Sequence, residues 1–339
     1  MSNLFPWHHQ QWRRLVDACK RDRLGHALLL RGRPGLGIPQ FARHFATALL
    51  CGESISETWP CGACQSCAFN SAGSHPDLVV VEPEEGRLRI GVAQVRYLIE
   101  ALSLAPKFSE HQVAILSPAE QLTREAANGL LKNLEEPPGE VVFLLVSYNS
   151  TAVPATIRSR CQLIDFPTPQ RAVAREWVAK QIPEDSDADW VLDVAGGAPL
   201  RALDIMLQGQ LTLRDKILES FVDVVRGQAD PLEVARSWQV VGTREALEWL
   251  ASLTTDCIKL SYGETASRLV NRDVLPALNQ LLELVERRCF YELWDRCLQA
   301  SRDRIASVGL NDQLLLEGVA MTCASLARPR GGSPSSRLF

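Results

Sequence analysis

Apolar residues in the first half of the chain form short runs that alternate with longer amphipathic stretches. The run at 141–146 is rich in β-branched and aromatic residues and is bounded by Gly139 and Asn149. A short continuous apolar run of this kind is typical of a strand buried on both faces. The alternation therefore predicts a mainly parallel sheet covered by helices on both sides. We expect strands at 27–30, 78–81, 113–116 and 141–146, and helices at 40–50, 92–104 and 123–136.

The pattern changes after Pro167-Thr168-Pro169, where apolar residues recur at helical spacing and no further strand is indicated. The clearest long helix is expected at 276–300, with Pro276 tolerated in its first turn. The fold class predicted is therefore α/β plus α. Shorter helices are expected at 170–181, 187–195 and 199–207, and the domains at 1–167 (α/β), 168–209 (small helical) and 210–328 (larger helical), followed by a disordered tail at 329–339 rich in Pro, Gly, Ser and Arg.

Composition narrows the class of protein. The 339 residues are 46% hydrophobic and 22% charged, which excludes a mainly disordered chain and fits two to three domains. The formal charge of −4 excludes a chain that is polycationic as a whole. Residues 1–15 lack the apolar core of a secretory signal, and the longest uncharged stretch, 141–157, contains polar residues and proline. We therefore expect a soluble, cytoplasmic protein with no membrane association.

A glycine-rich turn follows the first expected strand and precedes a helix, which is the context that a phosphate-binding P-loop requires. Gly32 and Gly37 hold the two glycine positions of that motif, with Gly35 between them. The lysine position is Ile38 and the hydroxyl position is Pro39. This turn therefore lacks the ammonium that reaches the phosphates, the Mg²⁺ ligand and one backbone N–H of the helix terminus. A strand-to-helix turn with no phosphate-binding ancestry explains the segment alone equally well.

A second motif of ATPases is altered in the same way. The apolar run at 113–116 ends in Ser117-Pro118, where an ATPase of this architecture carries acidic residues that hold Mg²⁺ and orient water. Neither residue can replace a carboxylate in those roles. Because both motifs keep their apolar framework and lack their chemical groups, the sequence indicates an ATPase fold without hydrolysis or a functional ATP site.

Four of the ten cysteines fall within 17 residues, with the spacing Cys51-x9-Cys61-x2-Cys64-x2-Cys67. Four thiolates in a tetrahedron form a closed structural zinc site, so we expect one structural zinc ion. An iron–sulfur cluster is the alternative, but its compact spacing would need a further cysteine where Ser71 stands. The remaining cysteines are expected to be small buried apolar residues: Cys19, Cys161, Cys257, Cys289, Cys297 and Cys323.

With these features together, the sequence resembles the bacterial clamp-loader AAA+ proteins of DNA polymerase III. The resemblance covers about half of the chain. It rests on the altered glycine loop, the four-cysteine insertion, Ser74-His75-Pro76-Asp77, the run AANGLLKNLEEPP at 126–138 and the triplet Ser159-Arg160-Cys161.

The resemblance implies an AAA+ α/β domain with a zinc insertion, a helical lid and a C-terminal helical collar that oligomerises. It also implies a position in a hetero-oligomeric ring with gamma/tau and delta subunits that loads the sliding clamp onto primer–template DNA in replication. The chain would have no catalysis of its own within a holoenzyme that is a DNA-directed DNA polymerase, a nucleotidyltransferase. Arg160, flanked by Ser159 and Cys161, would be an arginine finger acting in trans on the ATP of the neighbouring subunit.

Other positions of the family are matched less well. Ser147 falls on the polar sensor position, although a strand-end polar residue is the simpler interpretation where no nucleotide is expected. A gapless match places Leu200, and not Arg201, on the second sensor arginine. Candidate DNA contacts such as Arg87, Arg96 and Lys107 resemble ordinary surface charges.

Two alternative functions stay open at this point. One is a residual ATPase that uses Arg33 as a substitute cation, against which the missing acids at 117 and 118 argue. The other is a stand-alone zinc-containing DNA-binding protein, which the net acidity and the long helical C-terminal region disfavour.

Overall fold

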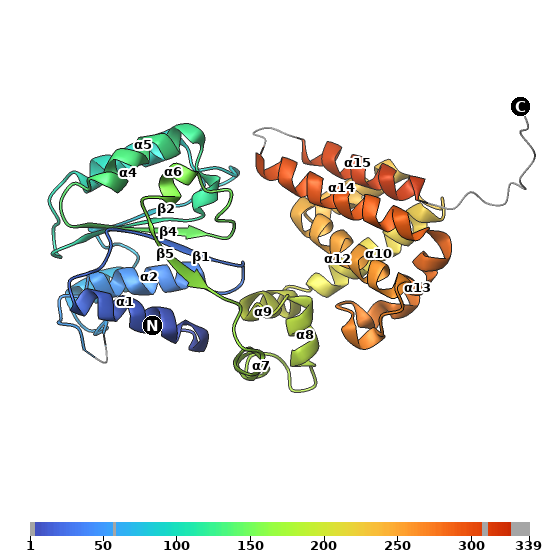
Figure 1. Ribbon diagram of the computed structural model, residues 1–339, viewed down its shortest axis with the longest axis horizontal. Helices are drawn as coiled ribbons and strands as arrows, with labels where there is room; N and C mark the ends of the chain where they lie inside the picture. The colour runs from blue at the N-terminus through green and yellow to red at the C-terminus, as the bar shows by residue number, and fades with distance from the viewer. Residues whose placement is uncertain (1–3, 57–58, 307–310, 327–339) are drawn as a thin grey trace, which may run out of the picture. The chain divides into compact units, whose positions relative to one another are not determined.

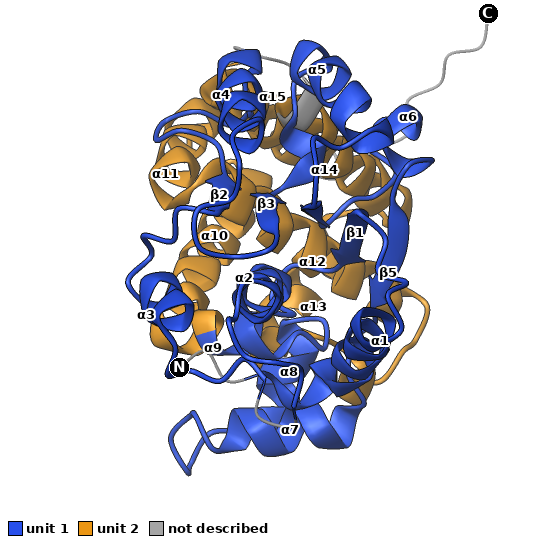
Figure 2. Ribbon diagram, turned by 90° about the vertical axis from the view of Figure 1, so that its left-hand side faces the viewer, with its two compact units in different colours: residues 1–203 blue, residues 204–339 orange. Residues whose placement is uncertain are grey.

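The computed structural model describes residues 4–56, 59–306 and 311–326. The chain divides into two compact units, residues 1–203 and 204–339 (Figure 2). The first unit holds the sheet and most of the small helical segment, and the second unit is helical. The tail predicted to be disordered, 329–339, lies outside the described residues.

A five-stranded parallel sheet forms the centre of the first unit, in the order β2-β3-β4-β1-β5. The four strands expected from the sequence are confirmed. The fifth, β5, was missed because it is an edge strand that exposes Gln162 and Asp165, so its apolar run is interrupted. The strands are β1 (Ala27–Gly32), β2 (Leu78–Val81), β3 (Gln112–Leu116), β4 (Val141–Ser147) and β5 (Gln162–Phe166).

Helices cover both faces of this sheet, as Figure 1 shows. Alternate residues of each strand point to opposite faces. Leu28 and Leu30 therefore share a core with the α1 and α2 side, whereas Leu29 shares one with the α4 and α5 side. The helices are α1 (His9–Lys20), α2 (Ile38–Leu49), α4 (Val92–Leu102) and α5 (Arg124–Glu135), with short α3 (Gln65–Ser71), α6 (Ala155–Arg158) and the 3-10 turns η1 (Pro6–His8) and η2 (Ala119–Gln121).

The small helical segment consists of α7 (Arg171–Ala179), α8 (Ala188–Val194) and α9 (Pro199–Leu207). Arg171 binds both Asp189 and Asp193, which joins α7 to α8. The start of α9 contacts the glycine loop, since the Leu200 N–H donates to the Gly35 carbonyl at 3.0 Å. The segment therefore lies against the loop that follows β1.

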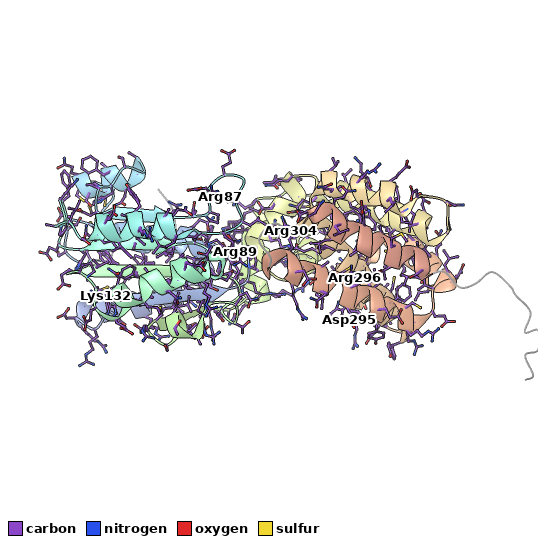
Figure 3. The ribbon with its side chains drawn as sticks, turned by 90° about the horizontal axis from the view of Figure 1, so that it is seen from above. Arg87, Arg89, Lys132, Asp295, Arg296 and Arg304 are labelled. Carbon is purple, nitrogen blue, oxygen red and sulfur yellow. The ribbon has the colours of Figure 1, made fainter. Side chains whose placement is uncertain are left out.

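The second unit is built from helices only, within the residues described for it. Arg296 and Arg304 lie on the same long helix, α14 (Figure 3), and Arg304 reaches both carboxylate oxygens of Asp312 on α15 at 3.2 Å. The helices are α10 (Gln210–Val225), α11 (Pro231–Val241), α12 (Thr243–Ser261), α13 (Leu275–Leu284), α14 (Arg287–Ala306) and α15 (Asp312–Ser325), with 3-10 turns η3 (Ala266–Arg268) and η4 (Arg272–Val274).

The expectation of one helix over 276–300 was wrong. Two helices, α13 and α14, occupy this region, and Val285 between them is extended (φ −121°, ψ 139°). Val285 is buried, with 1% of its surface exposed. A buried, β-branched residue at this turn continues the apolar spacing that a single long helix would show. The spacing of apolar residues alone therefore did not reveal the break. Pro276 does lie in the first turn of α13, as expected.

No helix among the described residues combines the length and the apolar character that crossing a membrane requires.

Candidate functional site

The glycine-rich loop joins β1 to α2 at the carboxyl edge of the sheet. Gly37 caps α2 in the left-handed region (φ 79°), and Gly35 has the same φ. Ile38, at the lysine position, begins α2 and is fully buried in the core, whereas Pro39 takes the next position of its first turn. The side chain at the lysine position is therefore part of the packing and cannot reach a phosphate.

Side chains of the chain itself occupy the space next to this loop. A Cβ atom added to Gly37 would lie 2.5 Å from the Phe5 ring, and one added to Gly35 would lie 2.6 Å from Cβ of Arg201. Phe5 in turn stacks on Trp7, with ring centroids 4.9 Å apart. The N-terminal aromatic residues and the start of α9 thus contact the loop from outside.

His8 supports the loop from the inside. It is buried, with 1% of its surface exposed, and its Nε2 lies 2.8 Å from the Leu36 carbonyl, so Nε2 carries the proton. Nδ1 has no partner among the described residues. Burial lowers the pKa of His8 to about 4, although the hydrogen bond to Leu36 opposes the shift.

Acidification is therefore expected to destabilise the first unit through His8. Because the folded pKa lies below the unfolded value near 6.5, the unfolded chain binds the proton more readily, and stability falls as the pH drops below 6.5 toward 4. Between pH 7 and pH 5 this group should contribute a loss of about 2 kcal/mol. Urea unfolding at both pH values measures the loss. His8→Gln keeps a donor for the Leu36 carbonyl but does not titrate, so the unfolding free energy of this variant should change less between pH 7 and pH 5. If the variant and the wild type lose the same unfolding free energy over this range, the assignment to His8 is contradicted.

The other altered motif lies at the same edge of the sheet. Ser117 and cis Pro118 follow β3 directly, and Ser147 ends β4. Ser147 is fully buried, and its Oγ has no partner within the described part of the chain. The carboxylate that the sequence did not reveal here is Glu120, whose Oε1 accepts the N–H groups of Tyr148 and Asn149 at 3.0 and 3.3 Å. Glu120 thus terminates β4 by binding its backbone.

The four-cysteine cluster is the candidate metal centre. The sulfur atoms of Cys51, Cys61, Cys64 and Cys67 all lie within 4.8 Å of one another, and the Cys51–Cys64 and Cys61–Cys67 pairs are each 3.9 Å apart. Four sulfur ligands 2.3 Å from a zinc ion stand about 3.8 Å from one another in a regular tetrahedron. The donor set and its spacing therefore fit one zinc ion with no open position.

Backbone N–H groups face the sulfur atoms of this cluster. The Cys67 N–H points to Sγ of Cys64 at 3.4 Å, and the Cys64 N–H to Sγ of Cys61 at 3.3 Å. Burial opposes ionisation of Cys64, but the N–H groups of Cys67 and Gly52 and the hydrogen bonds of the Cys67 and Cys61 thiols together lower the pKa of that thiol to about 6. Cys64 also caps α3, whose N-terminus favours a thiolate. These groups stabilise the anionic form that a metal requires.

A buried polar network connects this cluster to the sheet. Ser66 of α3 bonds His75 Nε2 at 2.7 Å and also donates to the Leu50 carbonyl. Nδ1 of His75 accepts the Asp77 N–H at 3.0 Å, while the Asp77 carboxylate accepts three N–H groups of residues 107–109. The Ser-His-Pro-Asp segment that precedes β2 therefore has a structural role in this fold.

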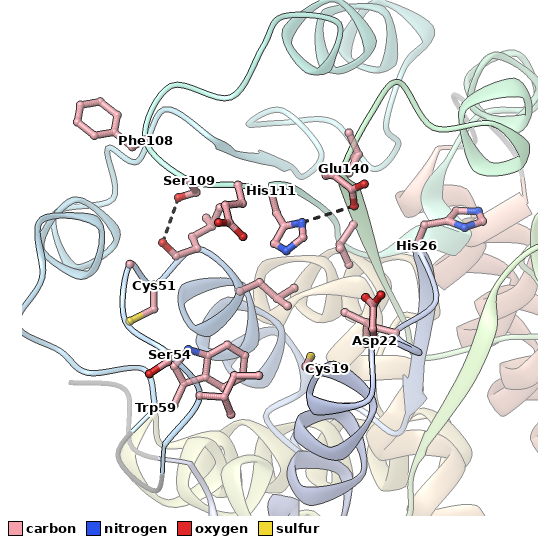
Figure 4. Close-up of a pocket in the computed structure, with 18 of the residues that line it drawn as sticks. Cys19, Asp22, His26, Cys51, Ser54, Trp59, Phe108, Ser109, His111 and Glu140 are labelled. Atoms are coloured by element: carbon pink, nitrogen blue, oxygen red, sulfur yellow. Dashed lines mark hydrogen bonds and ion pairs between the residues drawn. The ribbon is translucent and has the colours of Figure 1, made fainter.

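A pocket of about 750 Å³ lies beside Cys51 at the amino edge of the sheet, opposite the glycine loop. Figure 4 shows His26, His111, Glu140 and Asp22 around it. Nδ1 of His111 is 3.9 Å from Glu140, too far for a direct hydrogen bond. The pocket is thus separate from the place where a P-loop would hold a nucleotide.

The triplet Ser159-Arg160-Cys161 follows α6 directly. The Arg160 guanidinium pairs with Glu135 at the end of α5, and 33% of its side chain is exposed. Ser159 Oγ donates to the Thr156 carbonyl at 3.1 Å. Cys161 packs against the core on the α4 and α5 side, and burial raises its pKa to about 11. Ser159 is thus exposed and Arg160 partly exposed, whereas Cys161 is a packing residue.

The three basic candidates for DNA contact are not brought together. Arg87 lies between β2 and α4 (Figure 3) and pairs with Glu84 at 3.2 Å. Arg96 is exposed on α4, and Lys107 follows that helix at the opposite edge of the sheet. They therefore do not form one basic surface.

Comparison with known proteins identifies the family. Residues 7–170 match the family described as DNA polymerase III, delta subunit, and residues 208–322 match its C-terminal counterpart. A DNA polymerase III subunit delta' from Pseudomonas aeruginosa is 31% identical over 97% of this chain and 100% of the relative. The chain belongs to the delta-prime family of clamp-loader subunits of DNA polymerase III. The Escherichia coli delta-prime subunit is 30% identical over 96% of both chains.

Two solved structures are similar to this delta-prime chain over most of its length. A DNA polymerase III gamma subunit-related protein from Thermotoga maritima covers 93% of this chain and is itself covered completely, with a TM-score of 0.44 and 18% identity. The Thermotoga maritima RuvB branch-migration motor covers 87% of this chain and is covered over 86% of its own length, with a TM-score of 0.41 and 15% identity.

Proposed function

We propose that this delta-prime chain is the non-hydrolysing stator of the clamp loader and supplies Arg160 in trans to ATP held by a neighbouring gamma/tau subunit. The observation that supports this proposal is that the glycine loop of this chain lacks its phosphate-binding groups and is covered by other side chains. Ile38 is buried at the lysine position, and Phe5 and the start of α9 lie against the glycines. A chain that cannot bind the phosphates itself contributes to hydrolysis only through groups that it presents to another subunit.

The chemistry of Arg160 suits that task. Its planar guanidinium can contact two oxygens of a γ-phosphate and stabilise the charge that develops on them as the bond to the leaving phosphate breaks. The exposed third of the side chain is available to an adjacent subunit. Hydrolysis itself, including the metal ion and the attacking water, belongs to the neighbouring site, and this chain carries no catalysis of its own.

The cysteine cluster completes the stator in this proposal. Cys51, Cys61, Cys64 and Cys67 would hold one zinc ion that fixes the insertion between α2 and β2. A closed four-sulfur site has a structural role because no position is left for a substrate. The domains are proposed as 1–167, the lid at 168–209 and the oligomerising collar at 210–328, in a cytoplasmic ring with gamma/tau and delta that acts on the sliding clamp and primer–template DNA.

The alternative of a residual ATPase is less well supported. Arg33, the substitute cation, donates to the Gly196 carbonyl at 3.2 Å, and Ser117 and Pro118 offer no carboxylate for a metal. A stand-alone DNA-binding protein is disfavoured by the separation of Arg87, Arg96 and Lys107.

The isolated chain is expected not to bind Mg·ATP more tightly than about 1 mM, because the phosphate contacts are missing and the space next to the loop is filled. Isothermal titration measures this, with the cognate gamma/tau subunit as the positive control. Micromolar binding by the isolated chain would favour the residual ATPase.

Reconstitution tests the whole proposal. ATP hydrolysis by a gamma/tau–delta assembly is measured on primed DNA with the sliding clamp, with and without this chain. We expect stimulation on its addition and no hydrolysis by the chain alone. Hydrolysis by the chain alone, or no effect on the assembly, would overturn the proposal.

A further inference from the structure

Arg160 does not extend freely from the surface, because several contacts hold its guanidinium. Nε and Nη2 both bind the same oxygen of Glu135, and Nη1 lies 2.8 Å from the Thr156 carbonyl and 3.3 Å from Ser159 Oγ. These acceptors come from two different helices, α5 and α6, and from the residue that ends α6. Position and plane of the guanidinium are therefore both fixed.

The contacts leave part of the cation available. A guanidinium has five N–H bonds, and the edge formed by Nε and Nη2 faces Glu135. The second N–H of Nη2 has no acceptor among the described residues, and a third of the side chain is exposed. Arg160 can therefore stay bound to Glu135 while it donates to an anion that arrives from outside.

Glu135 stands at a place that is unfavourable for an isolated carboxylate. It is the last residue of α5, where the helix dipole disfavours negative charge. Its neighbour Glu136 is also exposed, but Glu136 contacts no cationic side chain in the part of the chain that the structure describes. Of the two acidic residues in this run, Glu135 alone is directed to the arginine.

We propose that Glu135 is a positioning residue for Arg160, which holds the guanidinium in one orientation before the neighbouring subunit presents its ATP. This inference rests on the proposed role of Arg160 as the finger. A free arginine must give up the freedom of a long side chain when it reaches a phosphate, whereas an arginine that is already held does not. Holding the guanidinium in place therefore lowers the barrier to ATP hydrolysis and does not stabilise assembly of the ring.

The test compares four chains in the complex reconstituted with gamma/tau, delta, sliding clamp and primed DNA: the wild type, Glu135→Ala, Arg160→Ala and the double variant. We expect Glu135→Ala to lower kcat for ATP about tenfold, since misplacement of a catalytic group costs one to two orders of magnitude, with KM for ATP unchanged. The double variant should be no slower than Arg160→Ala. Glu136→Ala removes the same charge one residue away and should match the wild type.

A second readout is made on the full-length chain without partners. The Nε–H group of Arg160 should show a lower NMR order parameter in Glu135→Ala than in the wild type or Glu136→Ala, because Nε–H donates to Glu135 and not to Glu136. A general structural defect would instead change the signals of many residues.

The outcomes separate the two proposals. If hydrolysis slows in Arg160→Ala but not in Glu135→Ala, only the positioning role is overturned. A Glu135→Ala rate above the wild type, or a double variant slower than Arg160→Ala, overturns the positioning role in the same way. No loss in either single variant overturns the finger itself. An unchanged order parameter in Glu135→Ala also overturns the positioning role.

Discussion

Replacement of Arg160 by alanine is expected to slow ATP hydrolysis by roughly 10³-fold or more at the neighbouring site that the proposed finger contacts. The physical reason is the loss of the cation that, in the proposed role, meets the γ-phosphate charge of the transition state. The fold should survive, because a third of the side chain is exposed and its contacts are made at the surface. Single-turnover hydrolysis in the reconstituted complex measures the effect, and circular dichroism checks the fold.

Two further variants make this result specific. Arg160→Lys keeps the charge but not the planar fork of donors, so it should recover only a small part of the rate. Arg43→Ala removes another arginine that is paired with a glutamate at the surface of the same unit, Glu82 at 3.0 Å, and should leave hydrolysis close to wild type. Wild-type hydrolysis and clamp loading in Arg160→Ala would refute the finger.

Much of the sheet could be predicted from the sequence because its central strands are buried on both faces. Every residue of β4 is buried, so the apolar run at 141–146 is unbroken and was easy to recognise. An edge strand has one exposed side, and Asp165 of β5 pairs there with Arg31 of β1. Such a strand has no continuous apolar run, so the local pattern did not distinguish it from a loop.

The candidate sites also differ in whether their contacts are local in the sequence, and only the local ones could be predicted from it. The cysteine spacing is local, and the structure brings the four sulfur atoms together as the spacing predicts. The contact between Glu135 and Arg160 joins residues 25 positions apart, and the one between Phe5 and Gly37 depends on how the N-terminus returns to the loop. Neither contact has a signature in sequence spacing. Missing motif residues show that a loop lacks its chemical groups, but only tertiary structure shows what occupies the space beside it.

Replacement of Cys64 by serine is expected to release the metal and to destabilise the first unit by about 3 kcal/mol, a fall in its unfolding midpoint of roughly 6–12 °C. The helix that Cys64 caps, α3, has only seven residues and is too short to be stable in isolation. Its order depends on the four sulfur atoms and on the contacts of Ser66 with Leu50 and His75. Because both cores of the sheet lie mostly outside this insertion, the loss should be partial.

Metal analysis and thermal unfolding of the same samples test this expectation. The wild type should carry about one zinc ion per chain, and Cys64→Ser should carry almost none. Cys19→Ser is the matched control, since Cys19 lies in the same unit but outside the cluster, and burial raises its pKa to about 11, which keeps it a neutral thiol. It should keep its zinc. Iron with inorganic sulfide in the wild type would instead show a cluster, and an unchanged midpoint after loss of the metal would mean that the polar network around His75 holds the insertion without it.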